Sequence, residues 1–321
     1  MNAVLITGAA GFLGSHLAEH FLNQGFAVIG LDNFCTGSRE NVALLKSQSA
    51  NFLFLESDVC APWSDAEQLL TNRKLQLKYV FHFASPASPE HYVRLALETI
   101  RVNTLGLQLA LEFADRHQAR TLFASTSEVY GDPEVSPQPE SYWGCVNSFG
   151  ERSCYDEAKR CGEAIIFSHN KRFKTQHGLV RIFNTYGPRM NPNDGRVVIN
   201  FILQALKNSD LTIYGTGEQT RSFCYVSDLI SGIAKYAASG ICTPINLGMD
   251  QEFTVLQLAE VVKKATGSKS VLKFLPLPSD DPRRRRPDLT LAKKNLDGWQ
   301  PGITLQEGVQ KMTDWLRTQI R

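Results

Sequence analysis

Two residues of the chain, Tyr155 and Lys159, have the types and the spacing of a proton-transfer pair. Residues four apart on a helix lie on the same face, one turn apart. A lysine ammonium beside a phenol favours the phenolate and lowers the tyrosine pKa toward neutrality. Such a phenol can take a proton from a sugar or alcohol hydroxyl while a hydride leaves the same carbon. The same spacing occurs on ordinary exposed helix turns, so its setting decides between the two readings.

A glycine turn near the start of the chain supplies that setting. A short apolar strand leads into Thr7-Gly-Ala-Ala-Gly-Phe-Leu-Gly14, and an amphipathic helix follows. Gly8 allows the tight turn, Gly11 lets the backbone approach a pyrophosphate, and Gly14 lets the helix pack close to the strand. A second strand ends at Asp32, about twenty residues past the turn, where a carboxylate binds the adenosine ribose. Because Asp32 would repel a 2′-phosphate, we expect NAD rather than NADP.

Strands and helices alternate along the first half of the chain. The predicted strands cover residues 3–6, 26–31, 51–55, 79–83, 119–124 and 178–183. This alternation predicts an α/β fold of Rossmann type, a doubly wound parallel sheet with helices on both faces. Ligands bind such sheets beyond the carboxyl ends of the strands. Ser85 and the stretch 125–128 lie at such ends.

The alternation weakens after about residue 183. We expect a Rossmann domain over residues 1–182 and a smaller, partly interleaved substrate-binding lobe over residues 183–321, with segments around 223–247 returning to the first domain. Within the first domain, residues 92–116 form a long helical region. Residues 133–150, rich in Pro, Ser and Gly, are expected to form a loop over the site.

Composition excludes several classes of protein. The chain has 321 residues, 43% hydrophobic and 21% charged, with a net charge of +2. So small a net charge produces only a weak electrostatic field, which argues against nucleic acid and anionic membranes as partners. No apolar stretch approaches the roughly 18 to 20 residues that span a bilayer, and no targeting segment is visible. Seven cysteines without a Cys-x-x-Cys pair favour a reduced, cytoplasmic protein, and the histidines lack metal-ligand spacing, so we expect no metal.

Together, the glycine turn, Asp32, Thr126, the Tyr155/Lys159 pair and Asn184 resemble the extended short-chain dehydrogenase/reductase family of nucleotide-sugar enzymes, over essentially the whole chain. Longer motifs resemble its UDP-glucuronate decarboxylase branch. They cover residues 84–89, 125–134, 154–160, 181–190 and 193–198. The resemblance implies bound NAD, UDP-glucuronate as substrate, UDP-xylose and CO2 as products, and a homodimer.

The resemblance also implies a set of binding residues. The cofactor is expected to contact Gly8, Gly11, Phe12, Leu13, Asp32, Asn33, Thr36, Gly37, Asp58, Val59, Phe83, Ala84, Ser85, Tyr155 and Lys159. Asp58 could reach the adenine amino group, although a simple strand-end turn accounts for it equally well. On the substrate side, Arg221 would bind the diphosphate and Asn184 the nucleotide, Val198 and Tyr214 would flank the uracil, and Arg101 would approach the uronate or a phosphate. Core packing is the alternative for Val198 and Tyr214.

The chemistry of a uronate decarboxylation defines further roles. Oxidising C4 places a ketone β to the C5 carboxylate, so the C–C bond can break with its electrons flowing into the ketone. Tyr155 would be the base at O4, Lys159 would hold its pKa down, and Thr126 would steady O4. Glu128 lies two residues past Thr126, so both can face one side of an extended segment. The resemblance places Glu128 and Arg285 at the departing carboxylate.

Arg285 lies in a run of four arginines, residues 283–286, that has a plainer interpretation. Such a run is commonly a solvated loop or a nucleic-acid patch. Asp280, Asp281 and Asp288 flank it and dilute its field. A guanidinium grips a carboxylate or diphosphate bidentately, so we assign a substrate role to Arg285 and leave Arg283, Arg284 and Arg286 unassigned.

Two departures from the family pattern and three rival functions remain. Ala158 replaces a usual Gly and Ser148 a usual Pro, and the second change puts the fit of the substrate in doubt. A UDP-sugar 4-epimerase would use the same Tyr, Lys and Thr but needs no acid at 128. A 4,6-dehydratase needs a general acid where Ser127 stands. A non-enzymatic, NAD-bound regulatory protein would predict loss of Tyr155 or Lys159, and both are present.

Overall fold

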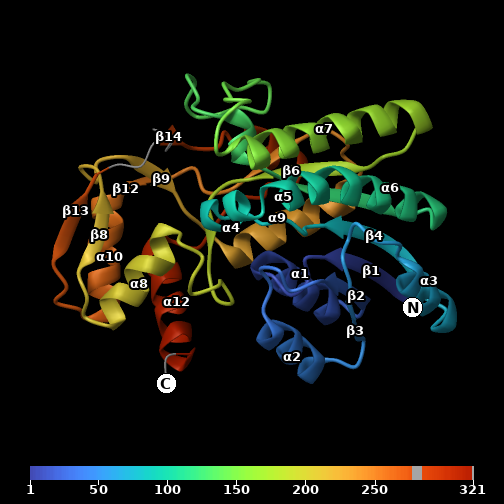
Figure 1. Cartoon of the computed structure of the whole chain (residues 1–321), viewed down its shortest axis with the longest axis horizontal. Coiled ribbons are helices and arrows are strands. Elements are labelled where there is room, and N and C mark those ends of the chain that lie inside the picture. The colour runs from blue at the N-terminus through green and yellow to red at the C-terminus, as the bar shows by residue number, and fades with distance from the viewer. Residues whose placement is uncertain (277–283, 320–321) are drawn as a thin grey trace.

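The computed structural model of the chain describes residues 1–276 and 284–319 (Figure 1). The unassigned Arg283 and the flanking Asp280 and Asp281 lie outside the described residues. None of the helices in the described ranges has the length and apolar character that crossing a bilayer requires.

A seven-stranded sheet forms the centre of the molecule, in the order β11-β6-β5-β4-β1-β2-β3. Every neighbouring pair in it is parallel. Its strands are β1 (Asn2–Thr7), β2 (Ala27–Asp32), β3 (Phe52–Glu56), β4 (Gln76–His82), β5 (Arg120–Thr126), β6 (Gly178–Ile182) and β11 (Ile245–Leu247). The predicted Rossmann-type α/β fold is confirmed.

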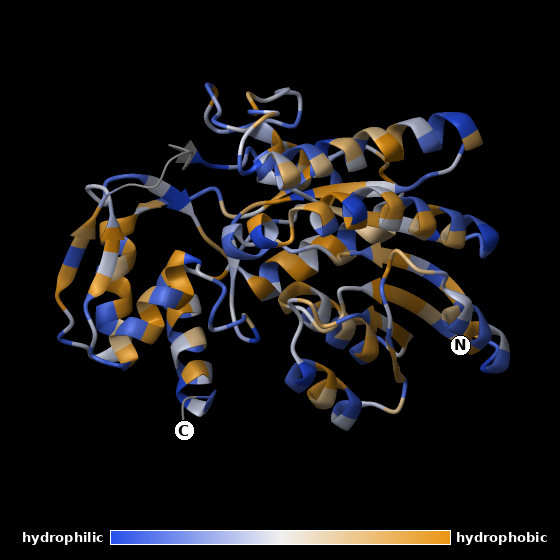
Figure 2. Ribbon diagram, in the orientation of Figure 1, coloured by the Kyte–Doolittle hydropathy of each residue, from blue (hydrophilic) through white to orange (hydrophobic). Residues whose placement is uncertain are grey.

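Helices cover both faces of this sheet. One layer contains α5 (Ala96–Arg101), the π-helical turn η1 (Val102–Gly106), α6 (Leu107–Arg116) and α7 (Ser153–Phe173), which contact one another. The other contains α1 (Phe12–Asn23), α2 (Arg39–Gln48) and α9 (Val226–Ser239). The remaining elements of this half are α3 (Ser64–Asn72), α4 (Pro89–Arg94) and the 3-10 turn η2 (Ser127–Tyr130). Because both faces are covered, the central strands are almost continuously apolar, as their orange colour in Figure 2 shows.

The helical region predicted over residues 92–116 is broken in the structure. Leu95, with φ −113° and ψ 46°, separates α4 from α5, and η1 interrupts the helix again. In η1 the Asn103 side chain donates to Thr99 O at 2.8 Å and to Ser85 Oγ at 2.9 Å. π-Turns of this kind are frequent at functional sites, and here the turn ties the helix layer to the end of β4.

The second half of the chain forms a smaller lobe, on the left in Figure 1. It contains three small sheets, β10-β7, β12-β9-β14 and β13-β8. Its elements are β7 (Thr185–Tyr186), α8 (Val197–Leu206), β8 (Leu211–Tyr214), β9 (Thr220–Ser222), β10 (Cys224–Tyr225), β12 (Glu252–Thr254), α10 (Val255–Thr266), β13 (Leu272–Leu275), β14 (Arg284–Arg285), α11 (Thr290–Asn295) and α12 (Leu305–Gln319). The neighbouring strands β9 and β10 belong to two different sheets.

The chain passes between the two halves more than once. β11 comes from the second half of the sequence yet pairs with β6 in the large sheet. One cluster of buried apolar side chains extends from Val4 in β1 to Leu316 in α12. The two halves therefore share a core, and the division at residue 182 stays a prediction.

Candidate active site

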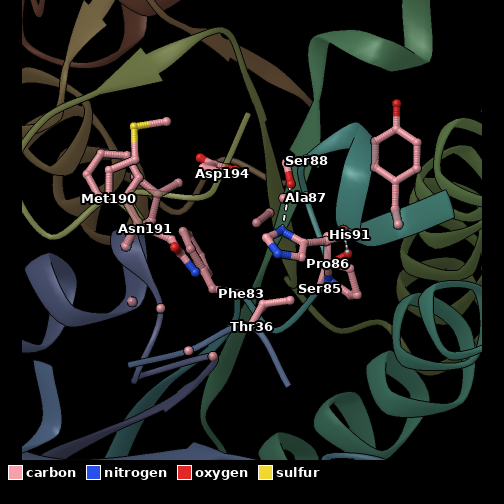
Figure 3. A pocket seen from close by; sticks show the side chains of 18 of the residues that line it. Thr36, Phe83, Ser85, Pro86, Ala87, Ser88, His91, Met190, Asn191 and Asp194 are labelled. Carbon is pink, nitrogen blue, oxygen red and sulfur yellow. Dashed lines mark hydrogen bonds between the residues drawn. The ribbon is translucent and has the colours of Figure 1, made fainter. Parts of the chain in front are cut away.

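A cavity of about 990 Å³ opens beyond the carboxyl ends of the central strands. All the predicted cofactor, catalytic and substrate residues line it except Tyr214, whose side chain is 46% exposed on β8. The contact of Tyr214 with the uracil stays a prediction. Figure 3 shows part of the lining, where the Ser88 hydroxyl and His91 Nδ1 are hydrogen-bonded at 2.7 Å.

The glycine turn has the geometry that a dinucleotide phosphate requires. Gly8 has φ +73°, and a Cβ there would lie 2.8 Å from the backbone N of Ala84. A Cβ on Gly14 would lie 2.0 Å from Gly8 O. Gly11 caps α1 without a side-chain hydrogen bond, so the first N–H groups of this helix are left for an anion.

Asp32 is held in place at the end of β2. Its Oδ2 accepts from the Ala10 N–H at 3.0 Å and its Oδ1 from the Phe34 N–H at 2.8 Å. Burial raises the pKa of Asp32, and these backbone hydrogen bonds oppose that rise. Gly37 packs over the turn, where a Cβ would lie 2.7 Å from the Ala10 Cβ. The residues present thus fit an adenosine ribose beside the glycine turn.

Asp58 forms a strand-end turn and also lines the cavity. Its Oδ1 accepts from the Cys60 N–H at 2.8 Å, the strand-end turn of the plainer interpretation. It also lines the cavity, beside the buried Val59. The contact of Asp58 with the adenine stays a prediction.

The helix α7 brings Tyr155 and Lys159 to the cavity. Tyr155 is 6% exposed, and its ring stacks on Tyr92 with centroids 4.8 Å apart and an interplanar angle of 9°. Thr126, at the end of β5, is hydrogen-bonded to the Tyr155 phenol. Lys159 Nζ donates to Ala124 O at 2.7 Å and lies 5.6 Å from the centroid of the Tyr155 ring. The predicted pair and Thr126 are therefore brought together.

The predicted lowering of the Tyr155 pKa is wrong for the protein in this state. Burial raises the pKa of Tyr155 to about 12, although the hydrogen bond with Thr126 opposes the rise. Burial also lowers the pKa of Lys159 to about 7. Burial disfavours both charged forms, and the Lys159 ammonium bonds a backbone carbonyl rather than the phenol. The sequence shows the spacing of the pair but not this loss of water.

Glu128 forms the second chemical centre of the cavity. Arg285 Nη2 donates to Glu128 Oε2 at 2.7 Å, Arg152 Nη2 donates to the same oxygen, and Arg285 Nη1 donates to Ser127 O. Burial alone would raise the pKa of Glu128, but the charges of Arg285 and Arg152 outweigh it and lower that pKa. Glu128 is therefore a partly buried, ionised carboxylate. The structure brings the predicted Glu128 and Arg285 together with Thr126.

Arg285 reaches this position on a short strand. In the β9–β14 pair, Arg285 is the register partner of Arg221, and both line the cavity. Two arginines that the sequence places far apart thus lie side by side. Arg286 Nη1 lies 3.7 Å from Glu252 with its side chain 40% exposed, which gives this unassigned residue a surface ion pair.

Three further predicted substrate residues line the cavity. Asn184 follows β6, Arg101 ends α5, and Val198 lies on α8. Val198 is only 3% exposed and also belongs to the main apolar cluster, so core packing accounts for part of its role. Ala158 is buried on α7, whereas Ser148 lies in an exposed part of the loop.

Sequence reasoning missed several residues of the cavity wall. They are His91, Tyr92, Arg152, Met190, Asn191, Asp194 and Arg196. Arg152 lies three residues before Tyr155, a spacing that places both on one side of a helix, so this one could have been found. The others come from loops or from the broken helical region, where no periodicity marks a position as facing a site.

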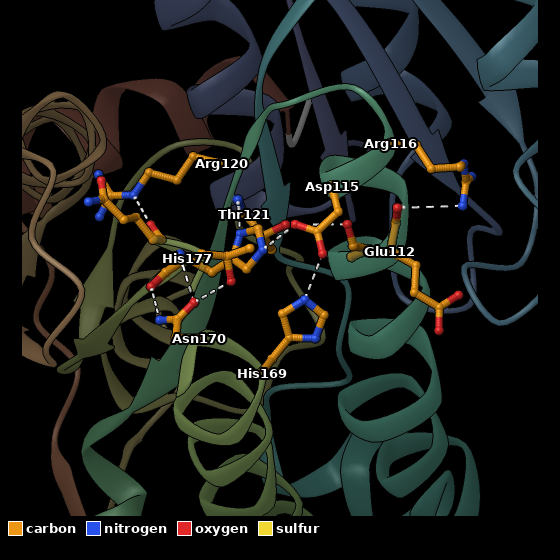
Figure 4. A network of polar contacts seen from close by, with 11 residues as sticks. Glu112, Asp115, Arg116, Arg120, Thr121, His169, Asn170 and His177 are labelled. Atoms are coloured by element: carbon orange, nitrogen blue, oxygen red, sulfur yellow. Dashed lines mark hydrogen bonds and ion pairs between the residues drawn. The ribbon is translucent and has the colours of Figure 1, made fainter. Parts of the chain in front are cut away.

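One group in the described part of the chain has side chains close enough to suggest a metal site (Figure 4). Asp115 accepts from His169 Nε2 at 2.8 Å and from His177 Nε2 at 3.0 Å. His177 Nδ1 accepts from the Thr121 N–H at 2.9 Å, so the ring proton lies on Nε2, the atom facing Asp115. These hydrogen bonds therefore connect α6, α7 and the residue directly before β6. The prediction of no metal stays a prediction.

A tyrosine and a lysine on one helix turn, facing a dinucleotide turn and a strand-end threonine, define a short-chain dehydrogenase/reductase on a Rossmann fold. The model of the NAD dependent epimerase/dehydratase family matches residues 4–248, and the chain belongs to this family. NAD, the predicted cofactor, is confirmed by that membership.

Curated relatives over nearly the whole chain are named UDP-glucuronic acid decarboxylase. UDP-glucuronic acid decarboxylase 1 of Xenopus tropicalis is 45% identical to this chain, and the match covers 99% of this chain and 72% of the relative. UDP-glucuronic acid decarboxylase 1 of Arabidopsis thaliana is 44% identical, and the match covers 99% of this chain and 70% of the relative. UDP-glucuronic acid decarboxylase 5 of the same plant is also 44% identical, and the match covers 99% of this chain and 90% of the relative.

Solved structures with the same fold include sugar-nucleotide epimerases. A UDP-glucose 4-epimerase of Thermotoga maritima with UDP-glucose has a TM-score of 0.89 at 29% identity, covering 99% of this chain and 100% of that one. A UDP-glucuronic acid 4-epimerase of Bacillus cereus in complex with UDP-glucuronic acid and NAD has a TM-score of 0.86 at 27% identity, covering 99% of each chain.

Proposed function

We propose that the protein converts UDP-glucuronate to UDP-xylose and CO2 by oxidation at C4, decarboxylation and re-reduction. The observation that carries this proposal is the ionised Glu128 held by Arg285 in the same cavity as Tyr155 and Thr126. The curated decarboxylases, at 44–45% identity over 99% of the chain, support it.

The residues around the glycine turn would hold the cofactor. The N-terminus of α1 would bind the pyrophosphate, Asp32 the adenosine ribose, and Lys159 the nicotinamide ribose. When bound, NAD accepts a hydride from C4 of the sugar and later returns it.

The protein's own residues manage the proton at O4. Tyr155 takes the O4 proton as the hydride leaves C4, and the Thr126 hydroxyl steadies O4. Lys159 favours the phenolate once its ammonium is charged, because an opposite charge nearby stabilises the ionised form. The product of this step is a ketone at C4.

The ketone then allows CO2 to leave. The C5–C6 bond breaks, its electron pair moves into the C4 carbonyl to form an enolate, and C6 departs as CO2. Arg285 orients the carboxylate, and the negative charge of Glu128 disfavours the carboxylate more than neutral CO2. A proton from solvent then adds at C5, the hydride returns to C4, and Tyr155 gives the O4 proton back, so the cycle is redox neutral.

The rival functions use part of this site. A 4-epimerase, the activity named for the two solved structures above, needs Tyr155, Lys159 and Thr126 but no acid at position 128. Even in an epimerase of a uronate the C5–C6 bond stays intact, so a second carboxylate beside the substrate carboxylate, Glu128, has no task in that reaction. A 4,6-dehydratase would need an acid where the buried Ser127 stands. A regulatory protein without catalytic activity would not need Tyr155 and Lys159, and both are present in this chain.

One incubation separates these functions. The protein with NAD and UDP-glucuronate is expected to release CO2 and form UDP-xylose, followed by NMR of the product sugar. UDP-galacturonate without CO2 would establish a 4-epimerase instead. An accumulating 4-keto pentose would mean that the return of the hydride is slow or absent.

A homodimer is part of this proposal. Val93, Leu97 and Ile100 on α4 and α5 are 46%, 78% and 42% exposed, and Phe167 on α7 is 70% exposed. Because α5 and α7 contact each other, these apolar side chains belong to one helix layer. Pairing of two such layers about a two-fold axis would remove them from water. Gel filtration at micromolar concentration should give a dimer, and a monomer would contradict it.

We also infer a cytoplasmic location. All seven cysteines are unpaired, and Cys35, Cys145 and Cys161 are exposed. Exposed free thiols persist in reducing compartments. The partner is then a soluble UDP-sugar, without nucleic acid or membrane, and localisation of a fluorescent fusion would test the compartment.

A further inference from the structure

We infer that Arg152, a residue outside the predicted site, contacts the carboxylate of the sugar substrate and selects acidic over neutral UDP-sugars. This inference rests on the proposed function, because it names the residue that recognises the acidic group of the same substrate. It is carried by the position of Arg152, its shared partner and the charges around it.

Arg152 is the residue directly before α7 and lies three positions before Tyr155. Residues three apart on a helix lie on the same side. Both side chains line the cavity. Arg152 therefore approaches the substrate from the same helix turn as the oxidising base.

Glu128 cannot neutralise both of its partners. Arg152 and Arg285 each donate to the same oxygen, Glu128 Oε2. One carboxylate thus faces two guanidinium groups, which leaves a surplus positive charge in a buried cavity. Such a charge is costly unless an anion pairs with it.

Asp156 is the other acid near this cluster, and it does not remove the surplus. Its Oδ2 lies 3.8 Å from Arg152 Nε, and its Oδ1 is buried without a hydrogen-bond partner. Burial, with the charge of Glu128, raises the pKa of Asp156 to about 7. At neutral pH Asp156 is only partly ionised, so the cavity still favours an added carboxylate.

The two arginines differ in how tightly they are held. The Arg285 side chain is 3% exposed, and both of its Nη atoms are bonded, to Ser127 O and to Glu128. The Arg152 side chain is 22% exposed. Its one hydrogen bond in the described structure goes to Glu128, and a guanidinium has five N–H donors. Arg285 keeps one buried Nε–H without a hydrogen-bond partner, whereas Arg152 is the more exposed of the two and has more of its donors accessible to a ligand.

Tyr92 links Arg152 to the oxidising base. The Arg152 guanidinium lies 5.9 Å from the centroid of the Tyr92 ring, which itself stacks on Tyr155. A substrate carboxylate bound at Arg152 would thus be placed at a set distance from the phenol that acts at O4. Neutral sugars would lose this placement.

The test compares two ligands that differ at C6, UDP-glucuronate and UDP-glucose. Their affinities for the NAD-bound protein are measured by calorimetry for the wild type, Arg152→Gln and Arg152→Lys. Because a hydrogen bond to a charged group contributes about 1.5–3 kcal/mol, Arg152→Gln should weaken UDP-glucuronate binding about 10- to 150-fold. It should leave UDP-glucose and NAD binding unchanged, and Arg152→Lys should restore part of the loss. Arg172→Gln, an exposed position on the same helix, is the control and should change neither affinity.

Arg152→Gln leaves Glu128 with one partner fewer and could fail to fold. In that case the double variant Arg152→Gln/Glu128→Gln is compared with Glu128→Gln alone. The double variant should bind UDP-glucuronate more weakly and UDP-glucose equally well. Equal losses for both sugars, or no loss for UDP-glucuronate, would overturn the inference. A wild type that binds UDP-glucuronate but releases no CO2 would overturn the proposed function alone, because the affinities still test Arg152.

Discussion

Tyr92 and Tyr155 stack nearly parallel, with ring centroids 4.8 Å apart, and this contact helps to shield the Tyr155 phenol from water. The contact joins the broken helical region to α7. Burial is the main reason that the pKa of Tyr155 is raised to about 12. The loss of water around Tyr155 therefore sets the pH at which its proton can leave.

Replacing Tyr92 should move the pH profile of sugar oxidation. Tyr92→Leu admits water to Tyr155, favours the phenolate and lowers the Tyr155 pKa, so the rise of the rate with pH should begin at lower pH. Single-turnover NADH formation measured from pH 6 to 10 would show the shift. Tyr92→Phe keeps the ring and is the control. A Tyr92→Leu profile that overlays the wild type would refute this account of the pKa.

Tyr155→Phe should stop the reaction at its first step. Without the phenolic oxygen no base takes the O4 proton, and we expect a loss of about 10²- to 10⁴-fold in NADH formation and in CO2 release alike. NAD affinity should stay close to that of the wild type. Full turnover in this variant would mean that another group is the base.

Glu128→Gln should separate oxidation from decarboxylation. NADH formation should persist, whereas CO2 release should slow by roughly 10²- to 10³-fold, because the ionised carboxylate beside the leaving group is gone. Rapid quenching with detection of the 4-keto uronate measures both steps. The loss of a buried ion-pair partner should also lower stability by about 3–5 kcal/mol.

A second ion pair with a similar degree of burial, outside the cavity wall, provides a control for the loss of stability in Glu128→Gln. Glu163 accepts from Arg181 Nη2 at 2.7 Å, with both side chains largely buried and neither in the cavity wall. Glu163→Gln should lose comparable stability but keep the rate of CO2 release. If both variants lose CO2 release equally, the role of Glu128 is structural.

Lys159 should make stability depend on pH. Its folded-state pKa, about 7, lies below the ordinary value of 10.5. Between these values the unfolded chain binds the additional proton, so the free energy of unfolding should rise as pH increases from 7 toward 10. The effect is on the order of a few kcal/mol. Lys159→Met should flatten this rise and stabilise the protein at pH 7, as urea unfolding at pH 7 and 9.5 would measure. An equal rise in both proteins would show that Lys159 is not its source.

Asp32 should set the preference for NAD. Its carboxylate, fixed by the Ala10 and Phe34 N–H groups, would lie near a 2′-phosphate and repel it. Calorimetry should show tighter binding of NAD than of NADP, and Asp32→Ser should reduce that preference at least about tenfold. Comparable wild-type affinities for both cofactors would contradict this.

The sequence predicted the parts of the site that local spacing determines. The glycine turn, Asp32 and the Tyr155/Lys159 pair follow from patterns within one strand–turn–helix unit or one helix turn. The parallel sheet follows from the alternation of its elements. These features need no knowledge of distant contacts.

Features that depend on distant contacts were missed or misjudged. The Tyr155 ring is stacked on Tyr92, which lies in the helical region whose break the sequence did not predict. The pairing of Arg152 with Glu128 joins a loop end to a strand end. Tyr214 has the residue type for a base-stacking contact, but its strand places it outside the cavity wall. Periodicity records neither a break nor the packing of one segment on another.

Because β11 follows β6 much later in the sequence, the large sheet stays incomplete while the chain is being synthesised. β6 ends at Ile182, but its outer neighbour is made only when Ile245–Leu247 leave the ribosome. Until then the growing chain exposes an unpaired strand edge beside apolar helices, a surface prone to aggregation. A nascent chain of this protein is therefore expected to engage chaperones throughout the synthesis of the second half.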